Sequence, residues 1–119
     1  VLVHAVLDAL VGAAGLEDIG SLFPDSSEEF RGISSLVLLE RVAGELAKRS
    51  ITAVNVDATV LAQAPKLAPY RAQMRANIAG ALGIETERVG VKATTEEHLG
   101  FTGDGSGMAA HAVALVERR

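Results

Sequence analysis

The sequence has no cysteine and no tryptophan, and its aromatic residues make up only 3% of 119 residues. Without cysteine there is no disulfide framework, no thiolate nucleophile and no cysteine-ligated zinc site, so any metal must use histidine and carboxylate ligands. Hydrophobic residues nevertheless reach 49%. The core must therefore be aliphatic, and this excess on a small chain suggests burial against partner subunits, although an alanine-rich helical core would give the same composition.

Clustered basic charge is also scarce. The net charge is −4, and basic residues stand together only as the pairs Lys48-Arg49 and Arg118-Arg119, which argues against a nucleic-acid partner. No uncharged run approaches the roughly 18 apolar residues of a membrane span. The longest such run, 105–116, contains His111. The length suits one domain with a single core.

Three stretches have helical periodicity. Apolar residues at three- and four-residue steps predict a first helix within 1–14, ending at Gly15. A second helix is predicted from a cap at Ser34 or Ser35 to about residue 49, and a third from about Pro69 to residue 82. The expected buried positions are Val3, Val6, Leu7, Leu10, Val11 and Ala14, then Leu36, Leu39, Val42, Ala43 and Leu46, then Tyr70, Met74, Ile78 and Leu82.

Other stretches favour strands and a loop. Residues 52–61 alternate, and so do residues 89–93, which predicts two half-buried strands. In the first strand Val54, Val56, Ala58 and Val60 are expected on one face, and Asn55, Asp57 and Thr59 on the other. Residues 18–32 have the composition of a loop. Residues 108–116 are ambiguous, because their alanines favour a helix while their alternation favours a strand.

Two polar groups are candidates for chemistry. Thr94, Thr95, Glu96 and Glu97 directly follow the second strand, and a glycine-rich segment comes after them. A polar strand end is a place where ligands bind, although a simple glycine-rich turn between strands would have the same pattern. His4 and Asp8 are four residues apart and share one helix face, as a metal-site pair or an ordinary surface pair would.

Four co-linear blocks resemble the 2-C-methyl-D-erythritol 2,4-cyclodiphosphate synthases, a family of non-mevalonate isoprenoid synthesis. The blocks are His4-Ala-x-x-Asp8-Ala-Leu, then Asp18-Ile-Gly-x-Leu-Phe-Pro-Asp25, then Asn55-Val-Asp with Ala62-Gln-Ala-Pro-Lys66, and finally Lys92-Ala-Thr-Thr with Glu97 and Leu99-Gly-Phe-Thr-Gly103. The resemblance extends to about residue 116. It implies one α/β (α+β) domain over 1–119, N-terminally incomplete, with a single layer of sheet, helices on one face and a final strand at 108–116. It also implies a homotrimer with active sites between subunits.

The resemblance implies a metal-dependent intramolecular phosphoryl transfer. Family enzymes convert 4-diphosphocytidyl-2-C-methyl-D-erythritol 2-phosphate to a cyclic diphosphate and CMP, using zinc together with magnesium or manganese. The substrate's own phosphate attacks, so the protein supplies positioning and charge neutralisation rather than a nucleophile. The expected location is the bacterial cytoplasm or the plastid stroma. The alternatives are a non-catalytic trimeric nucleotide-binding or regulatory module, or a structural subunit of the same fold.

Residue roles also follow from the resemblance. His4 matches a zinc ligand, Asp8 a residue that orients that ligand, and Glu97 a ligand of the second metal. Thr95 matches the residue that steadies the transferring phosphate, and Ala62 to Lys66 match the cytidine-binding loop. The substrate-binding positions implied are Asp18, Ile19, Gly20, Phe23, Pro24, Asp25, Ser26, Ser27, Ala62, Gln63, Ala64, Pro65, Lys66, Leu67, Ala68, Thr94, Thr95, Glu96, Glu97 and Phe101.

The chain departs from the family at several positions. The Asp-x-His pair and the lid that precede the first helix in the family do not occur in this sequence, which leaves one protein zinc ligand and predicts little cyclase activity. Asp104 and Ser106 stand where the family usually has Arg and Glu. Three Asp104 carboxylates on a trimer axis would repel an isoprenoid diphosphate. His98 and His111 match no ligand and are interpreted as structural.

Overall fold

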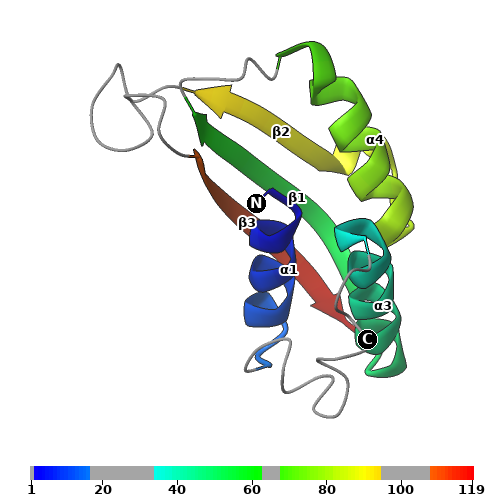
Figure 1. Cartoon of the computed structure of the whole chain (residues 1–119). Helices are drawn as coiled ribbons and strands as arrows, with labels where there is room; N and C mark the ends of the chain where they lie inside the picture. The colour runs from blue at the N-terminus through cyan, green and yellow to red at the C-terminus, as the bar shows by residue number, and fades with distance from the viewer. Residues whose placement is uncertain (1, 17–33, 63–67, 95–107) are drawn as a thin grey trace.

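The computed structural model describes residues 2–16, 34–62, 68–94 and 108–119. In chain order the elements are α1 (Leu2–Ala13), α3 (Ser35–Lys48), β1 (Ile51–Ala62), the 3₁₀ turn η1 (Ala68–Tyr70), α4 (Arg71–Leu82), the 3₁₀ turn η2 (Thr86–Arg88), β2 (Val89–Thr94) and β3 (Met108–Arg118). The strands form one mixed sheet, and the helices cover one of its faces (Figure 1). This confirms the predicted single layer of sheet with helices on one side. No helix in the described ranges is long and apolar enough to cross a membrane.

Strand β1 lies in the middle of the sheet, whose order is β2-β1-β3. It pairs with β2 in parallel and with β3 antiparallel. Leu61 is the partner of Thr94, and Ala62 is the partner of Met108. The carboxyl ends of β1 and β2 therefore lie beside the start of β3, at one end of the sheet, which is called the loop end below.

The core lies between the sheet and the helices. The periodic stripe of α1 is buried as predicted, with Val6, Leu7 and Leu10 fully inaccessible to solvent. Each such aliphatic side chain contributes about 1.5–3 kcal/mol through removal of apolar surface from water. The same core includes the predicted Leu39, Val42 and Leu46 of α3, Ile78 of α4, and Val56, Ala58 and Val60 of β1. The aliphatic composition thus builds one continuous core.

The helix boundaries follow the local sequence signals. The Ser34 hydroxyl accepts a hydrogen bond of 3.1 Å from the backbone N–H of Leu36, which caps α3 as expected for serine at this position. Gly15 follows α1 with φ +77° and Gly83 follows α4 with φ +69°. Both conformations are left-handed, which glycine adopts without a steric penalty, and both predicted helix stops are confirmed.

Tyr70 does not belong to the core stripe predicted for the third helix. Its side chain is 62% exposed, because residues 68–70 form η1 and α4 begins only at Arg71. The tighter 3₁₀ turn rotates successive side chains by a different angle from an α-helix, so Tyr70 is out of line with Met74. Met74 and Leu82 pack against the core as predicted.

The alternation predicted for β1 is broken at one point. The register against β3 shifts between Ala53 and Asn55, which places a β-bulge at Val54. Ile51 and Ala53 contact the core before the bulge, whereas Val56, Ala58 and Val60 do so after it. Before the bulge the odd-numbered residues face the core, and after it the even-numbered ones do. The prediction that Val54 shares a face with Val56, Ala58 and Val60 was therefore wrong at Val54. The ambiguous C-terminal segment is a strand, as the resemblance implied.

Candidate functional site

The loop end brings together segments that are far apart in the sequence. Ala62 ends β1 and is the first residue of the predicted cytidine-binding loop, so that loop begins in this region. Thr94 ends β2 beside Leu61 and is exposed. Because β1 and β2 are parallel and Leu61 pairs with Thr94, the two strands end beside each other. The structure thus places the starts of two predicted substrate-binding segments next to each other.

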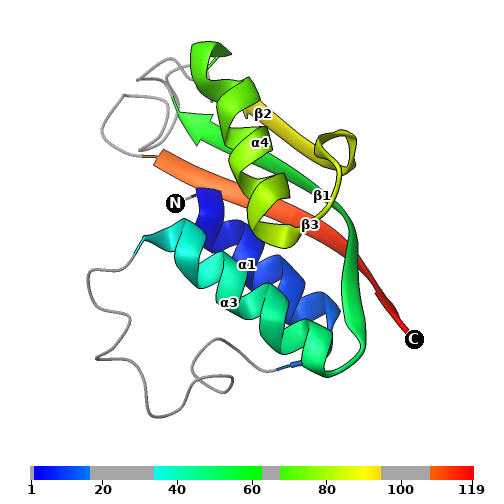
Figure 2. The same cartoon turned by 90° about the vertical axis from the view of Figure 1, so that its right-hand side faces the viewer.

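His4 and Asp8 both lie exposed on α1. The first turn of α1 points toward the loop end, and the helix then runs away from it alongside β3 (Figures 1 and 2). Neither side chain has a hydrogen bond or ion pair within the described ranges. The predicted support of His4 by Asp8 therefore stays a prediction, whereas the orientation of α1 is compatible with His4 facing a ligand at the loop end.

The face of the sheet opposite the helices, called the open face below, carries charge close to the loop end. Lys92 of β2 forms an ion pair with Asp57 of β1, and the two side chains are 54% and 57% exposed. Sequence analysis assigned no role to either residue, although both lie in the blocks that carry the resemblance. The signal that could have found the pair is opposite charge on the polar faces of two adjacent parallel strands.

A basic groove of about 300 Å³ lies along β2, between that strand and the start of α4. It is lined by Arg71, Arg75, Gly90, Val91 and Lys92. The Arg75 guanidinium donates to the backbone carbonyls of Val89, at 2.6 Å, and Thr86, at 3.0 Å, so it ties α4 to the start of β2. Lys92 is paired with Asp57. Cations thus surround the edge strand that leads to the predicted phosphate-contacting residues.

Sequence comparison identifies the family. A model described as the YgbB family matches residues 1–117. A 2-C-methyl-D-erythritol 2,4-cyclodiphosphate synthase of Thiobacillus denitrificans is 58% identical over 118 residues, which are 99% of this chain and 74% of that relative. The chain belongs to the YgbB family of cyclodiphosphate synthases. The resemblance carried by the four sequence blocks is confirmed, and so is its enzymatic character, while the alternative of a non-catalytic module is not favoured.

Solved structures of cyclodiphosphate synthases have the same fold. The bifunctional IspDF of Campylobacter jejuni superposes with a TM-score of 0.89 at 38% identity, covering 98% of this chain and 32% of that one. A CDP complex of Plasmodium falciparum IspF superposes with a TM-score of 0.82 at 31% identity, covering 98% of this chain and 70% of that one. A cytidine nucleotide therefore binds a relative of this fold.

The described residues by themselves do not complete the metal site expected for a cyclodiphosphate synthase. Within the described ranges, no three histidine or carboxylate side chains lie close enough to hold one ion. His4 supplies one exposed imidazole, which suits a zinc-type ion, but a tetrahedral site needs further ligands. Glu97, the expected ligand of the second metal, lies outside the described residues.

Most of the predicted site residues lie outside the described ranges, and their roles stay predictions. The structure describes His4, Asp8 and Thr94 with their side chains, and Ala62 and Ala68 as members of β1 and η1. The others are Asp18, Ile19, Gly20, Phe23, Pro24, Asp25, Ser26, Ser27, Gln63, Ala64, Pro65, Lys66, Leu67, Thr95, Glu96, Glu97 and Phe101, together with Asp104, Ser106 and His98. His111 is described, and it lies exposed on β3 opposite Thr59.

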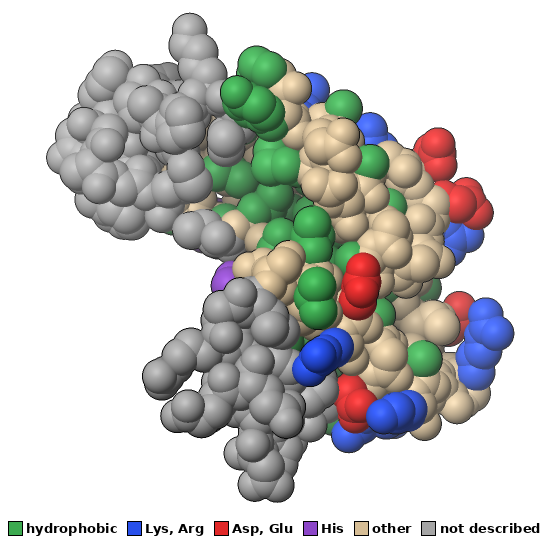
Figure 3. Space-filling model, turned by 45° about the vertical axis from the view of Figure 1, so that its right-hand side comes forward, with side chains coloured by type: hydrophobic (Ala, Val, Ile, Leu, Met, Phe, Trp, Pro, Cys, Tyr) green, Lys and Arg blue, Asp and Glu red, His purple; other side chains and the backbone are tan. Residues whose placement is uncertain are grey.

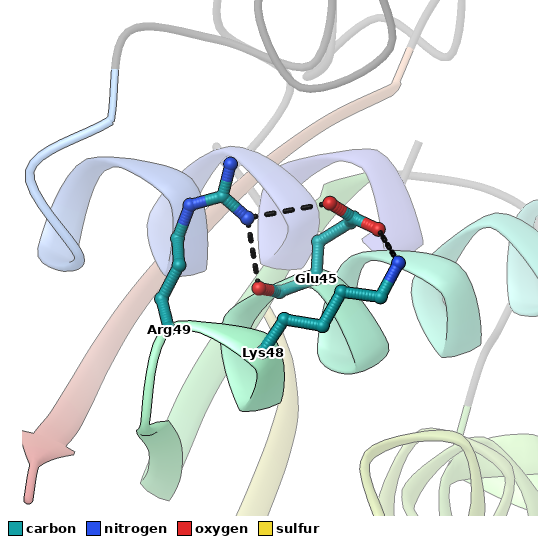
Figure 4. A network of polar contacts seen from close by, with 3 residues as sticks. All are labelled: Glu45, Lys48 and Arg49. Carbon is teal, nitrogen blue, oxygen red and sulfur yellow. Dashed lines mark hydrogen bonds and ion pairs between the residues drawn. The ribbon is translucent and has the colours of Figure 1, made fainter.

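A second polar cluster lies on α3, away from the loop end. Glu45 accepts from Lys48 at 2.8 Å and from Arg49 at 3.3 Å (Figure 4). The hydrogen bond from Lys48, followed by that from Arg49, lowers the pKa of the Glu45 carboxyl. Figure 3 shows acidic and basic side chains intermixed on the helical side of this synthase. The α3 cluster is thus an ordinary surface network at the end of a helix, which makes it a useful control for the Asp57–Lys92 pair.

Proposed function

We propose that the reaction this chain's active site serves is the conversion of 4-diphosphocytidyl-2-C-methyl-D-erythritol 2-phosphate to the cyclic diphosphate and CMP. An oxygen of the 2-phosphate attacks the β-phosphorus, a new P–O bond forms, and the bond from the β-phosphorus to the oxygen bridging it to the α-phosphorus breaks. That oxygen leaves with CMP, so the reaction consumes no water and no redox partner. The observation that carries the proposal is that β1 and β2 end beside each other, at Ala62 and Thr94, where two predicted substrate-binding segments begin, in a member of this family.

The two segments would divide the work of binding. Residues 62–66 offer backbone groups to the cytosine base, and Lys66 supplies a cation. Thr94 and Thr95 offer hydroxyls, and Thr95 steadies the transferring phosphate. Holding both phosphates in line supplies most of the rate enhancement that this kind of phosphoryl transfer needs. The remaining predicted contacts come from residues 18–27, Ala68, Glu96 and Phe101.

Two metal ions belong to the same proposal. His4 would be the one ligand of a zinc-type ion that this sequence supplies, and Asp8 would hold the ring of His4 in orientation. Glu97 would hold magnesium or manganese through its carboxylate oxygens. Such ions neutralise charge on phosphate oxygens when they are bound. The chain's own part is to place these donors at the loop end.

Assembly as a homotrimer, with each protomer a single domain over 1–119, completes the proposal. On the open face Val113 is 73% exposed and Leu115 is 58% exposed, and both belong to β3. Large aliphatic side chains on a sheet face that no described helix covers support packing against other copies of the chain. A site between subunits would then combine the loop end of one protomer with residues 18–27 of its neighbour. The bacterial cytoplasm or plastid stroma is the proposed location.

CMP release from the authentic substrate tests the proposal. Because this sequence supplies one zinc ligand, the 119-residue chain by itself should bind CMP in calorimetry but release little of it from the substrate. The same chain preceded by the family's Asp-x-His segment should release CMP only with a divalent metal, and a chelator should stop that release. In this longer chain, Glu97→Gln should lose magnesium-dependent turnover and keep the parent's fold by circular dichroism. Near-normal turnover of that variant would refute the role of Glu97, and CMP binding without release by the longer chain under any metal condition would indicate a nucleotide-binding module.

A further inference from the structure

The Asp57–Lys92 ion pair joins the two strands that lead into the candidate site. Asp57 of β1 has Gly90 as its partner in β2, and Lys92 has Thr59 as its partner, so the contact runs diagonally across the strand pair. Lys92 lies two residues before Thr94, where β2 ends. The pair thus connects the strands just before both enter the loop end.

Gly90 makes room for this contact. A Cβ atom built at Gly90 would lie 2.9 Å from Oδ1 of Asp57, and its two next nearest neighbours, at 3.8 and 3.9 Å, are also atoms of Asp57. The carboxylate therefore lies over the backbone of Gly90, at the place where Lys92 can reach it. An alanine at position 90 would meet the Asp57 carboxylate first and displace it, so a side chain at this position would disturb the ion pair.

Stability alone does not account for the arrangement. Both side chains are more than half exposed, and ion pairs with this exposure contribute little to folding. Glycine in a strand is itself unfavourable relative to residues with a side chain. The ion pair stabilises the fold only weakly and requires a glycine in the strand. Its effect on how β1 and β2 lie relative to each other therefore explains it better than its effect on folding stability.

We propose that Asp57, Gly90 and Lys92 form a clamp that fixes how the ends of β1 and β2 lie relative to each other. The clamp sets the spacing between Ala62 and Thr94, where the two predicted substrate-binding segments begin, and hence the fit of a cytidine nucleotide. This inference rests on the proposed function for its ligand and names positioning residues rather than groups that touch the substrate. The strand geometry it describes is independent of that function.

Four variants of the full chain test the clamp. Lys92→Met removes the cation at similar size, Gly90→Ala displaces the carboxylate, and the double variant combines both. Lys92→Arg keeps a cationic donor and should behave like the parent. Lys48→Met is the matched control, because it removes a lysine from the exposed ion pair with Glu45 on α3. For each protein, CMP affinity is measured by calorimetry, mass by light scattering, and amide hydrogen exchange at residues 59–62 and 91–94.

Lys92→Met and Gly90→Ala should each weaken CMP binding about 3- to 10-fold, and the double variant should be no weaker than either single one. Amide exchange at both strand ends should be faster, because the strand ends open more often. The thermal midpoint and the mass should match those of Lys48→Met. The double-variant result distinguishes a shared clamp from two independent effects, since independent effects would multiply.

Three outcomes would overturn the clamp. The first is CMP affinity and exchange rates that match the control, and the second is multiplicative weakening in the double variant. The third is dissociation of the assembly, seen as a lower molar mass in light scattering, in the same variants that lose CMP affinity. The Asp57–Lys92 ion pair would then act at a contact between copies of the chain. If the parent binds no CMP, the proposed function fails, and the exchange rates decide alone: faster exchange at the strand ends upholds the clamp, and unchanged exchange refutes it.

Discussion

The two faces of the sheet are built from the same three strands but have opposite chemistry. On the covered face Val56 and Val60 are 1% and 2% exposed, and they pack against the helices. On the open face the neighbouring positions hold Asn55, Asp57 and Thr59 of β1, while β3 exposes Val113 and Leu115. The covered face is thus stabilised by burial within the chain. The open face keeps charged and apolar side chains exposed, where another molecule could contact them.

The largest expected effect is on assembly, and it tests whether the open face contacts other copies. Leu115→Asp places a carboxylate among the exposed aliphatic side chains of β3, and a charge buried at a subunit contact without a partner is strongly unfavourable. Light scattering at micromolar concentration should show the parent as a trimer and the variant as a monomer.

Val37→Asp is the matched control, because Val37 is 38% exposed but lies on α3, on the other side of the molecule. It should leave the mass of the parent unchanged. A parent that is monomeric at this concentration would remove the proposed site between subunits, and equal behaviour of the two variants would show that the open face has no special role.

On the covered face, the expected effect is on stability. Leu10→Ala removes a fully buried side chain of α1 and leaves a cavity, which should lower the free energy of unfolding by about 2–5 kcal/mol. Urea denaturation measures this change. The control variant Val37→Ala, at an exposed position, should change the free energy of unfolding by less than about 0.5 kcal/mol. Similar losses at both positions would mean that the helical layer is not packed as the structure describes.

A smaller effect is expected at the end of a covering helix. Ser34→Ala removes the hydroxyl that accepts from the N–H of Leu36, and loss of such a cap costs about 1 kcal/mol. Ser34→Asp keeps an acceptor and should retain the parent's stability in the same urea titration. If alanine and aspartate destabilise equally, the cap hydrogen bond does not hold the start of α3.

The smallest effect is expected from Glu45→Gln on the outer side of the helical layer. Lys48 and then Arg49 lower the pKa of Glu45 in the folded protein, so its contribution to stability is present above the ordinary carboxyl pKa and is lost as pH falls through the lowered value. At pH 7 the variant's thermal midpoint should be at most about 2 °C below the parent's. The difference should shrink as the pH falls through the lowered pKa of Glu45, and a difference that grows on acidification would contradict the assigned direction.

Local patterns in the sequence were sufficient for most elements, because each signal acts over a few residues. The three-to-four-residue period located α1 and α3, Ser34 marked a cap, and Gly83 marked a stop. The same approach failed at Tyr70, since a 3₁₀ turn and an α-helix place side chains differently within one short segment. It also missed the bulge at Val54, whose cause is pairing with β3, a strand more than fifty residues away in the chain.

For the candidate site, too, the sequence pointed to individual residues but not to the contacts between them. The motif blocks of the sequence pointed to the family and to His4, Thr94 and Glu97 as site residues, and the YgbB match confirmed the family. Which residues meet was a different matter. Asp57 and Lys92 are separated by 35 positions, and no periodicity relates them. Their contact follows from the parallel register of β1 and β2 and from the missing side chain at Gly90.

The sequence by itself determined the helices, the strands, the aliphatic core and the family, because short-range periodicity and co-linear motifs are properties of the chain alone. Tertiary structure decided the strand order β2-β1-β3, the antiparallel pairing of β3 with β1, and which face of the sheet stays open. Those outcomes depend on long-range pairing and on which surfaces the helices bury. Both are set by contacts between segments that are far apart in the sequence, which local sequence patterns do not specify.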